Sequence, residues 1–279
     1  MLLQRVITAV LLLALLLPTL WVASPWPFAL LTLLLVAAAA WEWSRLNGVA
    51  ALAAVGPGAL LALAGLLAVR AGSVGSIPAP VWWATAATWL VVGSAALRGG
   101  VSSWPRWPAV ARLAFGLLAL WVAWLALVQA RAIGVNFLLS ALCLVWVADI
   151  AAYAAGRAFG RHKLAPTISP GKSWEGVVGG MVGVLALAVL WVHGVDRAWP
   201  VDSASLYTQL VERAGWLGLL PLGLALGGFS VMGDLFESLV KRAAGVKDSS
   251  RLLPGHGGVL DRIDALLPVL PAAMAMATL

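Results

Sequence analysis

Two pairs of carboxylates near the C-terminus have the residue types and spacing to bind a hard metal ion. Asp234 and Glu237 are three residues apart, and so are Asp261 and Asp264. Residues three apart share one face of a helix, so each pair can present its oxygens together. Oxygen ligands without cysteine are what Mg²⁺ prefers. The spacing predicts a magnesium site between two helices.

Basic residues surround these carboxylates. Five of them lie between Glu237 and Asp264: Lys241, Arg242, Lys247, Arg251 and Arg262. Lys241 also shares a helix face with Asp234 and Glu237. Lysine and arginine side chains donate well to phosphate oxygens. A metal-bound triphosphate is therefore the ligand that this cluster suits.

Ion pairing is the structural alternative, because charges inside a membrane protein often pair with one another across two helices. Such pairing explains one pair of charges better than it explains nine charges beside a glycine-rich turn. His256, within that turn, is interpreted as a hydrogen-bonding turn residue before it is interpreted as a metal ligand.

A second polar cluster begins at Asp149. Asp149, Tyr153 and Arg157 are four residues apart in turn, so they share one helix face. Gly156 and Gly160 allow another backbone to approach this helix closely. The next loop, residues 169–173, contains Ser169, Lys172 and Ser173.

That loop ends where a helix is expected to begin. Backbone N–H groups, a lysine and two hydroxyls there could bind phosphate. The spacing is not that of a Walker motif, and a plain connector is the alternative interpretation.

Composition indicates that all of this belongs to a polytopic membrane protein. The 279 residues are 62% hydrophobic, and their mean hydropathy is +0.98. An all-α fold with nine transmembrane helices is predicted at residues 6–23, 27–44, 50–69, 81–97, 109–128, 132–150, 176–194, 215–235 and 257–277. Residues 6–17 could instead form a signal-peptide core, but the apolar pattern resumes after Pro27, which favours a retained helix.

Lysine and arginine positions predict the orientation, since short loops rich in them stay cytoplasmic. With a cytoplasmic N-terminus and an external C-terminus, only Arg70, Arg131, Arg197 and Arg213 of the 18 basic residues fall outside. Residues 1–130 would form about five N-terminal helices. Residues 131–279 would form the catalytic region, with cytoplasmic loops at 157–175 and 241–256.

Cysteine and tryptophan say less about function. Cys143 has no disulfide partner, being the single cysteine, and is interpreted as a small core residue. Seven tryptophans near predicted helix ends are expected to be interfacial anchors: Trp21, Trp26, Trp41, Trp43, Trp104, Trp107 and Trp216.

The stretch at residues 238–264, which ends in HGGVLDRID, resembles the signature of the phosphatidate cytidylyltransferase family. The SPGKSWEG segment at residues 169–176 resembles another loop of that family. Ser250 stands where many members carry glycine. The resemblance covers the C-terminal half, whereas the first five predicted helices resemble the family only in hydropathy.

The resemblance implies transfer of a cytidylyl group from CTP to phosphatidic acid at the cytoplasmic face of the cell membrane. Mg²⁺ held by Asp234 and Asp261 would neutralise phosphate charge, and whether a second cation joins it stays open. Lys241 and Asp264 complete the implied catalytic set. The implied supporting residues are Glu237, Asp149 and Arg157.

Substrate contacts are implied for a larger group of side chains. They are Ser169, Lys172, Ser173, Ser238, Arg242, Lys247, Asp248, His256 and Arg262. The expected partners are the two substrates and the lipid bilayer, with no nucleic acid polymer, and a homodimer is left open.

Two other classes of function fit the sequence less well. A transporter would place its charges near the middle of the bilayer on broken helices, whereas these charges gather at one rim. A polyprenol-phosphate sugar transferase would share the metal and the lipid phosphate but lacks this signature.

Overall fold

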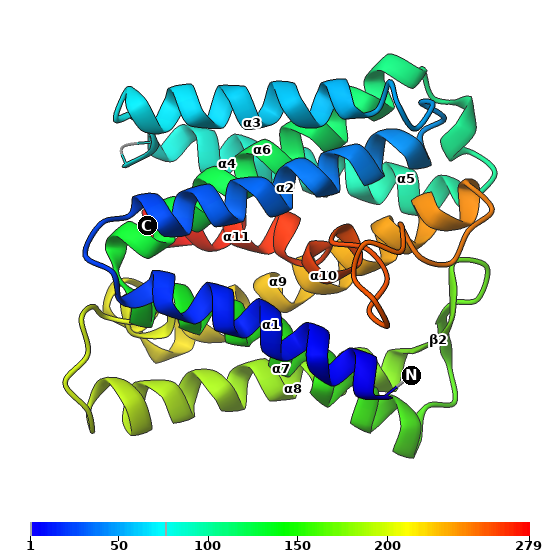
Figure 1. Ribbon diagram of the computed structural model, residues 1–279. Coiled ribbons are helices and arrows are strands. Elements are labelled where there is room, and N and C mark those ends of the chain that lie inside the picture. Colours follow the sequence, from blue (N-terminus) through cyan, green and yellow to red (C-terminus); the bar gives the residue numbers. More distant parts are fainter. Residues whose placement is uncertain (1, 76) are drawn as a thin grey trace.

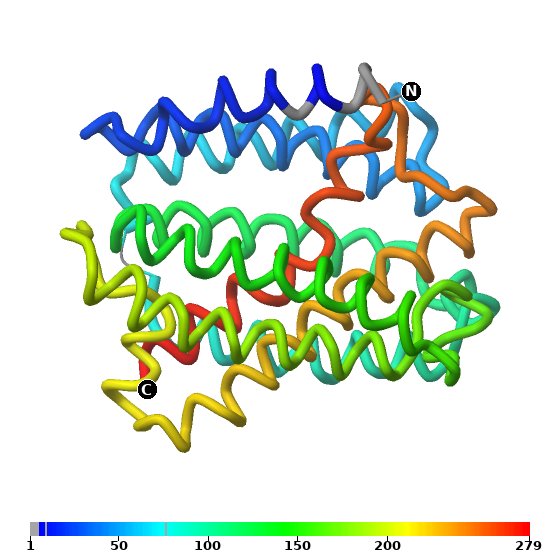
Figure 2. Tube along the Cα trace, turned by 90° about the horizontal axis from the view of Figure 1, so that it is seen from below, coloured from blue at the N-terminus to red at the C-terminus, as the bar shows by residue number. Residues whose placement is uncertain are grey.

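The computed structural model describes residues 2–75 and 77–279. They form a bundle of long helices that run side by side, with connections at its two ends (Figure 1). The N-terminus and the C-terminus lie at opposite ends of the bundle in both views (Figures 1 and 2). An odd number of passes along the bundle produces this arrangement.

The first half of the chain contributes α1 to α6. Their bounds are α1 Leu2–Trp21, α2 Trp26–Leu46, α3 Val55–Arg70, α4 Ala79–Thr88, α5 Ser94–Gly99 and α6 Ala109–Ile133. A π-helical segment, η2 (Trp89–Gly93), joins α4 to α5, and short 3₁₀ turns, η1 (Ser73–Gly75) and η3 (Trp104–Arg106), lie in the connections.

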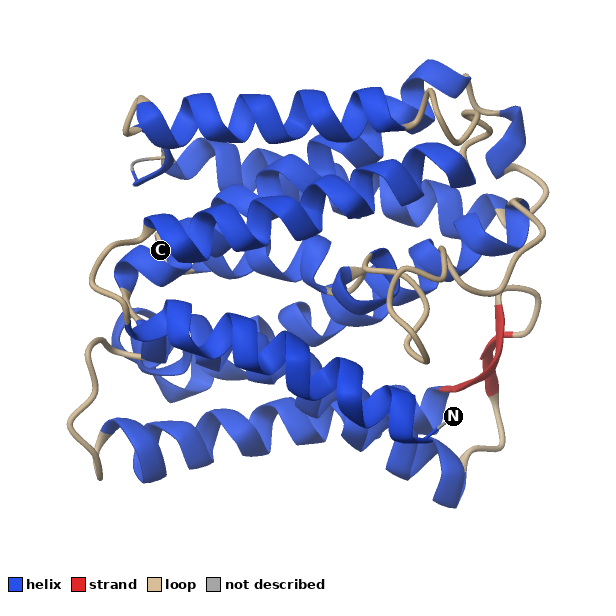
Figure 3. Ribbon diagram, in the orientation of Figure 1, coloured by secondary structure: helices blue, strands red, loops and turns tan. Residues whose placement is uncertain are grey.

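The second half contains the remaining elements. They are α7 Val135–Phe159, β1 Lys163–Ala165, β2 Ser169–Ser173, α8 Trp174–Trp191, η4 Val192–Asp196, α9 Leu206–Ala243, α10 Leu260–Ile263 and α11 Leu266–Met276. The expected all-α fold therefore needs one correction, because β1 and β2 pair as an antiparallel hairpin (Figure 3). Pro170 and Gly171 disfavour helix in β2.

In the part of the chain that the structure describes, six helices are long and apolar enough to cross a membrane: Trp26–Leu46, Ala79–Gly99, Ala109–Ile133, Val135–Phe159, Trp174–Asp196 and Leu206–Ala243. Two shorter apolar helices, Val6–Trp21 and Val55–Arg70, accompany them. A helical, multi-pass membrane protein is therefore the architecture, as the hydropathy predicted.

The last predicted span, residues 257–277, differs most from the expectation. A loop occupies residues 244–259, and the helix is interrupted between α10 and α11. Pro268 has no N–H to donate to the carbonyl of Asp264, which instead accepts from Leu267 N at 3.3 Å. The α11 helix is buried from Leu267 to Met276 and packs against α4, α6 and α9.

Helix α9 also differs from its predicted range of 215–235. It runs for 38 residues, and a break in the helical backbone occurs at Gly215, where φ is 68°. Glycine adopts this left-handed conformation without the steric cost of a Cβ atom. The predicted range therefore begins at this break, before which residues 206–214 form a separate helical segment, and the helix continues past residue 235 to Ala243.

Small residues hold α7 and α8 close together. A Cβ atom added to Gly176 would lie 2.9 Å from the carbonyl oxygen of Ala152, and one added to Gly156 would lie 3.5 Å from Gly176 Cα. The predicted close approach at Gly156 is therefore confirmed. This seam fixes the position of β2, which leads directly into α8.

An aromatic cluster fills the core beneath the charged end of α9. Phe236 contacts Trp43, Trp89, Trp104 and Phe115, with ring centroids 5.2–6.1 Å from its own. The prediction of interfacial anchors is therefore wrong for Trp43 and Trp104, which are each 1% exposed. Hydropathy does not reveal which face of a helix meets its neighbours.

Trp21, Trp26 and Trp216 are exposed, in keeping with the predicted anchors. Cys143 is half-buried and free.

Candidate functional site

The two polar clusters of the sequence meet at one end of the bundle. This end carries the β1–β2 hairpin, the end of α9, the loop of residues 244–259 and α10 (Figure 1). The ammonium of Lys172 on β2 contacts Asp234 Oδ2 on α9. Residues far apart in the chain therefore form one site, in which basic side chains of one cluster meet carboxylates of the other.

Asp234, Glu237 and Lys241 follow one face of α9, as their spacing predicted. The Lys241 ammonium lies 2.5 Å from Glu237 Oε2 and 2.6 Å from Asp261 Oδ1. Ser238 donates to Asp234 Oδ1 at 3.4 Å. Lys241 thus joins a carboxylate of α9 to one of α10, which is the ion pairing weighed as an alternative.

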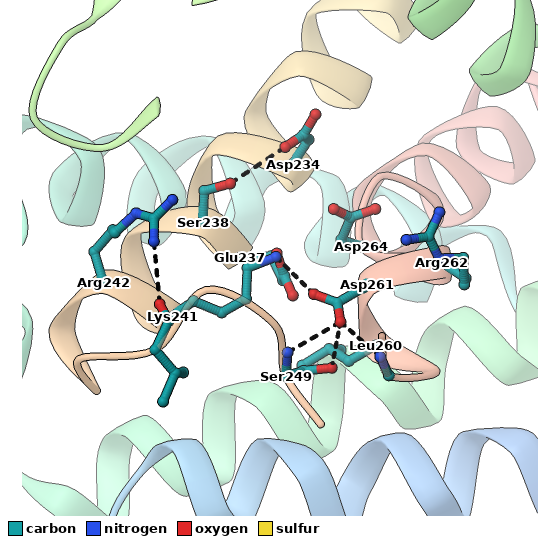
Figure 4. A network of polar contacts seen from close by, with 12 residues as sticks. Asp234, Glu237, Ser238, Lys241, Arg242, Ser249, Leu260, Asp261, Arg262 and Asp264 are labelled. Carbon is teal, nitrogen blue, oxygen red and sulfur yellow. Dashed lines mark hydrogen bonds and ion pairs between the residues drawn. The ribbon is translucent and has the colours of Figure 1, made fainter. Parts of the chain in front are cut away.

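Asp261 is the most heavily hydrogen-bonded carboxylate of the site (Figure 4). Its Oδ2 accepts from Gly258 N at 2.7 Å, from Ser249 N at 3.0 Å and from Ser249 Oγ at 3.0 Å. These donors belong to the preceding loop, so the loop fixes the orientation of this side chain. A Cβ atom on Gly257 would lie 2.7 Å from the same oxygen.

Asp264 points toward the region between Asp234 and Asp261 (Figure 4). Its Oδ1 accepts from Ala265 N at 2.7 Å. Gly233 permits this approach, since a Cβ atom there would lie 2.6 Å from the Asp264 carbonyl oxygen. Four carboxylates, those of Asp234, Glu237, Asp261 and Asp264, therefore converge between α9 and α10.

A cavity of about 470 Å³ opens beside Asp234, between α7, β2, α8 and α9. Its polar lining includes Asp149, Tyr153, Arg157, Ser169, Lys172, Ser173, Ser230 and Asp234. Glycines, alanines, Val177, Val231 and Met181 form the rest of the lining. The hairpin end of the cavity is polar through Ser169, Lys172 and Ser173. The helical walls combine the polar residues of α7 and α9 with apolar ones, so the cavity suits an amphipathic molecule.

The predicted helix face of α7 is confirmed. Asp149, Tyr153 and Arg157 all line the cavity, and the Arg157 guanidinium donates to the Tyr153 hydroxyl at 3.2 Å. Among the described groups, neither Asp149 nor Arg157 forms an ion pair, so their charges face the cavity.

The Ser169–Ser173 segment is a strand, not the plain loop of the sequence interpretation. Ser173 caps α8 by accepting from Gly176 N at 3.2 Å, and Trp174 N donates to the His162 carbonyl at 2.9 Å. Glu175 accepts from the backbone of Arg161 and His162. Ser169, Lys172 and Ser173 of this segment line the cavity, and Lys172 supplies its positive charge.

The loop side chains lie farther out. Lys247 and Asp248 are exposed, and Arg242 donates to the Val246 carbonyl at 3.3 Å. Arg262 donates to the His256 carbonyl at 2.6 and 3.1 Å. His256 N donates to the Leu253 carbonyl at 2.8 Å, which fits the turn role expected for it.

Glu42 of α2 is the residue that sequence reasoning missed. It is 0% exposed, and its carboxylate accepts hydrogen bonds from the loop and from α10. One signal was available, since Glu42 is the only acidic residue before Asp149. A lone carboxylate in an apolar helix needs a partner somewhere in the fold.

The donor chemistry of the site fits a hard cation, because all four converging acids supply oxygen. Within residues 2–75 and 77–279, however, no three His, Cys, Asp or Glu side chains are grouped closely enough to hold a metal ion by themselves. Lysine ammonium groups contact Asp234, Glu237 and Asp261. A cation would therefore need further oxygens from a bound phosphate, as Mg²⁺ commonly does.

Comparison with known proteins finds relatives along the whole chain. The model of the cytidylyltransferase family matches residues 3–279. The phosphatidate cytidylyltransferase of Pseudomonas aeruginosa is 43% identical over 288 aligned positions, covering 99% of this chain and 97% of that protein.

Two further relatives carry the same name. That of Haemophilus influenzae is 49% identical over 138 positions, or 50% of this chain and 44% of that protein. That of Staphylococcus saprophyticus is 41% identical over 150 positions, or 54% of this chain and 52% of that protein.

Proposed function

The chain belongs to the cytidylyltransferase family, and on that basis we propose that it transfers the cytidylyl group of CTP to phosphatidate. The products are CDP-diacylglycerol and pyrophosphate. The observation that carries the proposal is 43% identity to a phosphatidate cytidylyltransferase along 99% of the chain. A charged site at one end of an apolar bundle supports it, because the reaction joins a water-soluble nucleotide to a lipid.

The reaction needs charge neutralisation more than it needs a base. An oxygen of the phosphatidate phosphate attacks the α-phosphorus of CTP, and the bond from that phosphorus to the bridging oxygen of pyrophosphate breaks. A phosphomonoester is already largely ionised near neutral pH, so no proton has to be removed from the nucleophile. Two highly charged anions must approach each other, and cations lower that barrier.

Lysine and arginine side chains supply this positive charge. Lys172 lies at the polar end of the cavity, and Lys241 lies at the centre of the carboxylate group. Arg242, Lys247 and Arg262 lie on the outer side, where they would meet the phosphates of CTP. Ser169, Ser238, Asp248 and His256 are proposed as further substrate contacts, and Ser173 adds to them from the N-terminus of α8.

Mg²⁺ is proposed as the cofactor, with Asp234 and Asp261 as its protein ligands. When bound, it would neutralise phosphate charge and orient the leaving group. Glu237, Asp264, Asp149 and Arg157 would support this arrangement from around it. Asp234 and Asp261 each contact a lysine ammonium, so these lysines can transfer from carboxylate to phosphate as the substrate binds.

The cavity beside Asp234 is proposed to receive the phosphatidate headgroup. Arg157 and Lys172 at its polar end would bind the phosphate. The small residues of α7 and α8, such as Ala152 and Gly180, leave room for the glycerol and the first part of the acyl chains. Phosphatidate would enter sideways from the bilayer, and CTP from the aqueous side.

The membrane arrangement is also part of the proposal. We place nine spans in the bacterial inner membrane, with the N-terminus and the site on the cytoplasmic side, where CTP is found. Opposite positions of the two termini along the bundle support an odd number of spans (Figure 1).

Cysteine labelling tests this orientation. A single cysteine that replaces Lys163 or Lys247 should react with impermeant reagents only from the cytoplasm, and one that replaces Asp202 only from outside. Labelling of Lys247 from outside would contradict both the orientation and the function.

The direct test is an assay of purified protein in mixed micelles with CTP, phosphatidate and Mg²⁺. CDP-diacylglycerol should form, and other nucleoside triphosphates should give much less product. Failure to form it with active lipid and nucleotide, in a preparation that remains folded, would overturn the proposed function.

A further inference from the structure

Glu42 occupies a position that the proposed chemistry does not use. It lies in the last turns of α2 and is fully buried. Among the described residues, none of the ion pairs includes it. An unpaired charge in such a place is costly unless hydrogen bonds surround it, so its partners show what it does.

Those partners are four donors from a single distant segment. Glu42 Oε1 accepts from Ser250 Oγ at 2.5 Å and from Val259 N at 3.0 Å. Its Oε2 accepts from Leu260 N at 2.7 Å and from Ser249 Oγ at 3.2 Å. The contacts therefore span more than 200 residues of sequence and join α2 to both ends of the loop before α10.

The same segment orients Asp261. Ser249 N and Gly258 N both donate to Asp261 Oδ2. The Ser249 hydroxyl lies within hydrogen-bond distance of both Asp261 and Glu42, and its one hydrogen serves one of the two carboxylates at a time. A side chain at Gly258 would displace the Glu42 carboxylate, because a Cβ atom there would lie 2.4 Å from Glu42 Oε1. Glu42 and Asp261 thus hold the loop from its two sides.

From these contacts we propose that Glu42 is a positioning residue: its carboxylate fixes the two ends of the 249–260 loop, and the loop fixes Asp261. Glu42 reaches no cavity lining residue and is not itself catalytic. The proposal rests on the proposed function for its kinetic consequence, but the fixing of the loop is a separate claim. Through Glu42, the N-terminal half of the chain would help to hold the active site in place.

Glutamate is needed here because each of its oxygens accepts from a backbone N–H, Oε1 from Val259 and Oε2 from Leu260. Glutamine has one acceptor oxygen, so in either orientation its amide NH₂ would face one of these N–H groups. A buried donor left without an acceptor is destabilising. The α2 helix itself has other contacts, including the stacking of Trp43 on Phe236, so the bundle should persist when the loop is released.

Ser250 is a local feature of this attachment. It supplies one of the four donors, and a glycine at this position would not. Replacing it removes one hydrogen bond to Glu42 and the one that Leu252 N donates to the Ser250 hydroxyl at 3.0 Å, and it leaves the contacts of Asp261 in place. Ser250→Gly is therefore a milder version of the same change, available if Glu42→Gln fails to fold.

Two readouts test the proposal. The first is the rate of maleimide labelling at Leu253→Cys in a Cys143→Ala background, because Leu253 is half-buried in the attached loop. Glu42→Gln should raise this rate severalfold, and Ser250→Gly should raise it less. The matched control is Glu212→Gln, the same replacement at an exposed position of α9, which should leave the rate unchanged.

The second readout is kinetic. Because a displacement of about 1 Å can cost about a hundredfold in rate, Glu42→Gln should lower kcat by tenfold to a hundredfold. It should also raise the Mg²⁺ concentration for half-maximal rate, while the KM for phosphatidate changes little. A residue that only stabilised the fold would lower yield and leave these constants unchanged.

The results of these experiments distinguish a failure of the role proposed for Glu42 from a failure of the proposed function. If the wild-type protein makes no CDP-diacylglycerol, the function fails, and labelling alone still tests the role of Glu42. Unchanged labelling in Glu42→Gln would overturn the role, even with a slower reaction. If that variant cannot be purified, unchanged labelling in Ser250→Gly would overturn it.

Discussion

Carboxylates gather at both ends of the bundle, but their partners differ. At the end opposite the site, Asp196 accepts from Asn136 Nδ2 at 2.7 Å, from Ser205 Oγ at 2.5 Å and from Thr208 Oγ1 at 2.5 Å. At the site, Asp234 and Asp261 contact lysine ammonium groups. The first arrangement uses neutral donors alone, whereas at the site a lysine contacts Asp234 and another adds to the neutral donors of Asp261.

Asp202 belongs to the neutral type. It accepts from Val135 N at 2.6 Å and from Asn136 N at 3.0 Å, which are the first backbone N–H groups of α7. This carboxylate therefore caps a helix from a neighbouring loop. The comparison teaches that carboxylates held only by backbone and hydroxyl donors fasten the fold, whereas a carboxylate that also faces a lysine, as Asp234 does beside the cavity, can exchange that lysine for a ligand.

The largest expected effect comes from neutralising the site carboxylates. Asp234→Asn and Asp261→Asn should each lower kcat by about a hundredfold or more, equivalent to about 3 kcal/mol of transition-state stabilisation. Steady-state rates at saturating CTP, phosphatidate and Mg²⁺ measure this. Asp196→Asn is the matched change at the other end and should keep kcat. Near-normal turnover in Asp234→Asn would remove that residue from the catalytic group.

A smaller effect is expected from Lys172→Ala. Without its ammonium, the polar end of the cavity loses a phosphate contact, so the KM for phosphatidate or CTP should rise about tenfold. The Mg²⁺ concentration for half-maximal rate should stay unchanged when both substrates are saturating. Lys163→Ala, an exposed lysine on the same hairpin, is the control. Unchanged KM values for both substrates would make β2 a connector only.

Asp202→Asn should give the smallest effect, on stability and not on rate. Loss of the cap on α7 should cost about 1 kcal/mol, measured by thermal unfolding in micelles followed through tryptophan fluorescence. If Asp202→Asn changed kcat and left stability unchanged, the two ends of the bundle would not differ in role as described.

The pH dependence of this stabilisation has a definite sign. Burial opposes ionisation of Asp202, but hydrogen bonds from Asn136 N and Val135 N outweigh it and lower its pKa. A lowered pKa means that the stabilisation is complete above the ordinary aspartate pKa of about 4 and is lost as the pH falls toward the folded-state pKa. The Asn variant should therefore differ from wild type at neutral pH and converge with it in acid.

Helix periodicity predicted the parts of the site that lie on one element. Spacing alone predicts that Asp234, Glu237 and Lys241 share one helix face. It predicts the same of Asp149, Tyr153 and Arg157. The contact of Lys172 with Asp234 does not follow from spacing, because it depends on how closely α7 and α8 pack and where β2 ends. That registry is set by glycine contacts such as Gly156 with Gly176.

Burial was harder to predict than helicity. Trp43 and Trp104 lie near helix ends, yet they pack around Phe236 because α9 crosses there. Glu42 finds its four donors more than 200 residues away, at a distance that no local pattern covers. The interruption before α11 was visible in Pro268, but its burial depends on the surrounding helices.

One paired measurement tests the central claim most directly. CDP-diacylglycerol and pyrophosphate are quantified against CTP consumed, with and without phosphatidate, for the wild type, Asp234→Asn and Asp196→Asn. Equal amounts of both products per CTP, only with phosphatidate present, are expected for the wild type and Asp196→Asn, and almost none for Asp234→Asn. Equal turnover in all three proteins would contradict the assignment of the reaction to this end of the bundle.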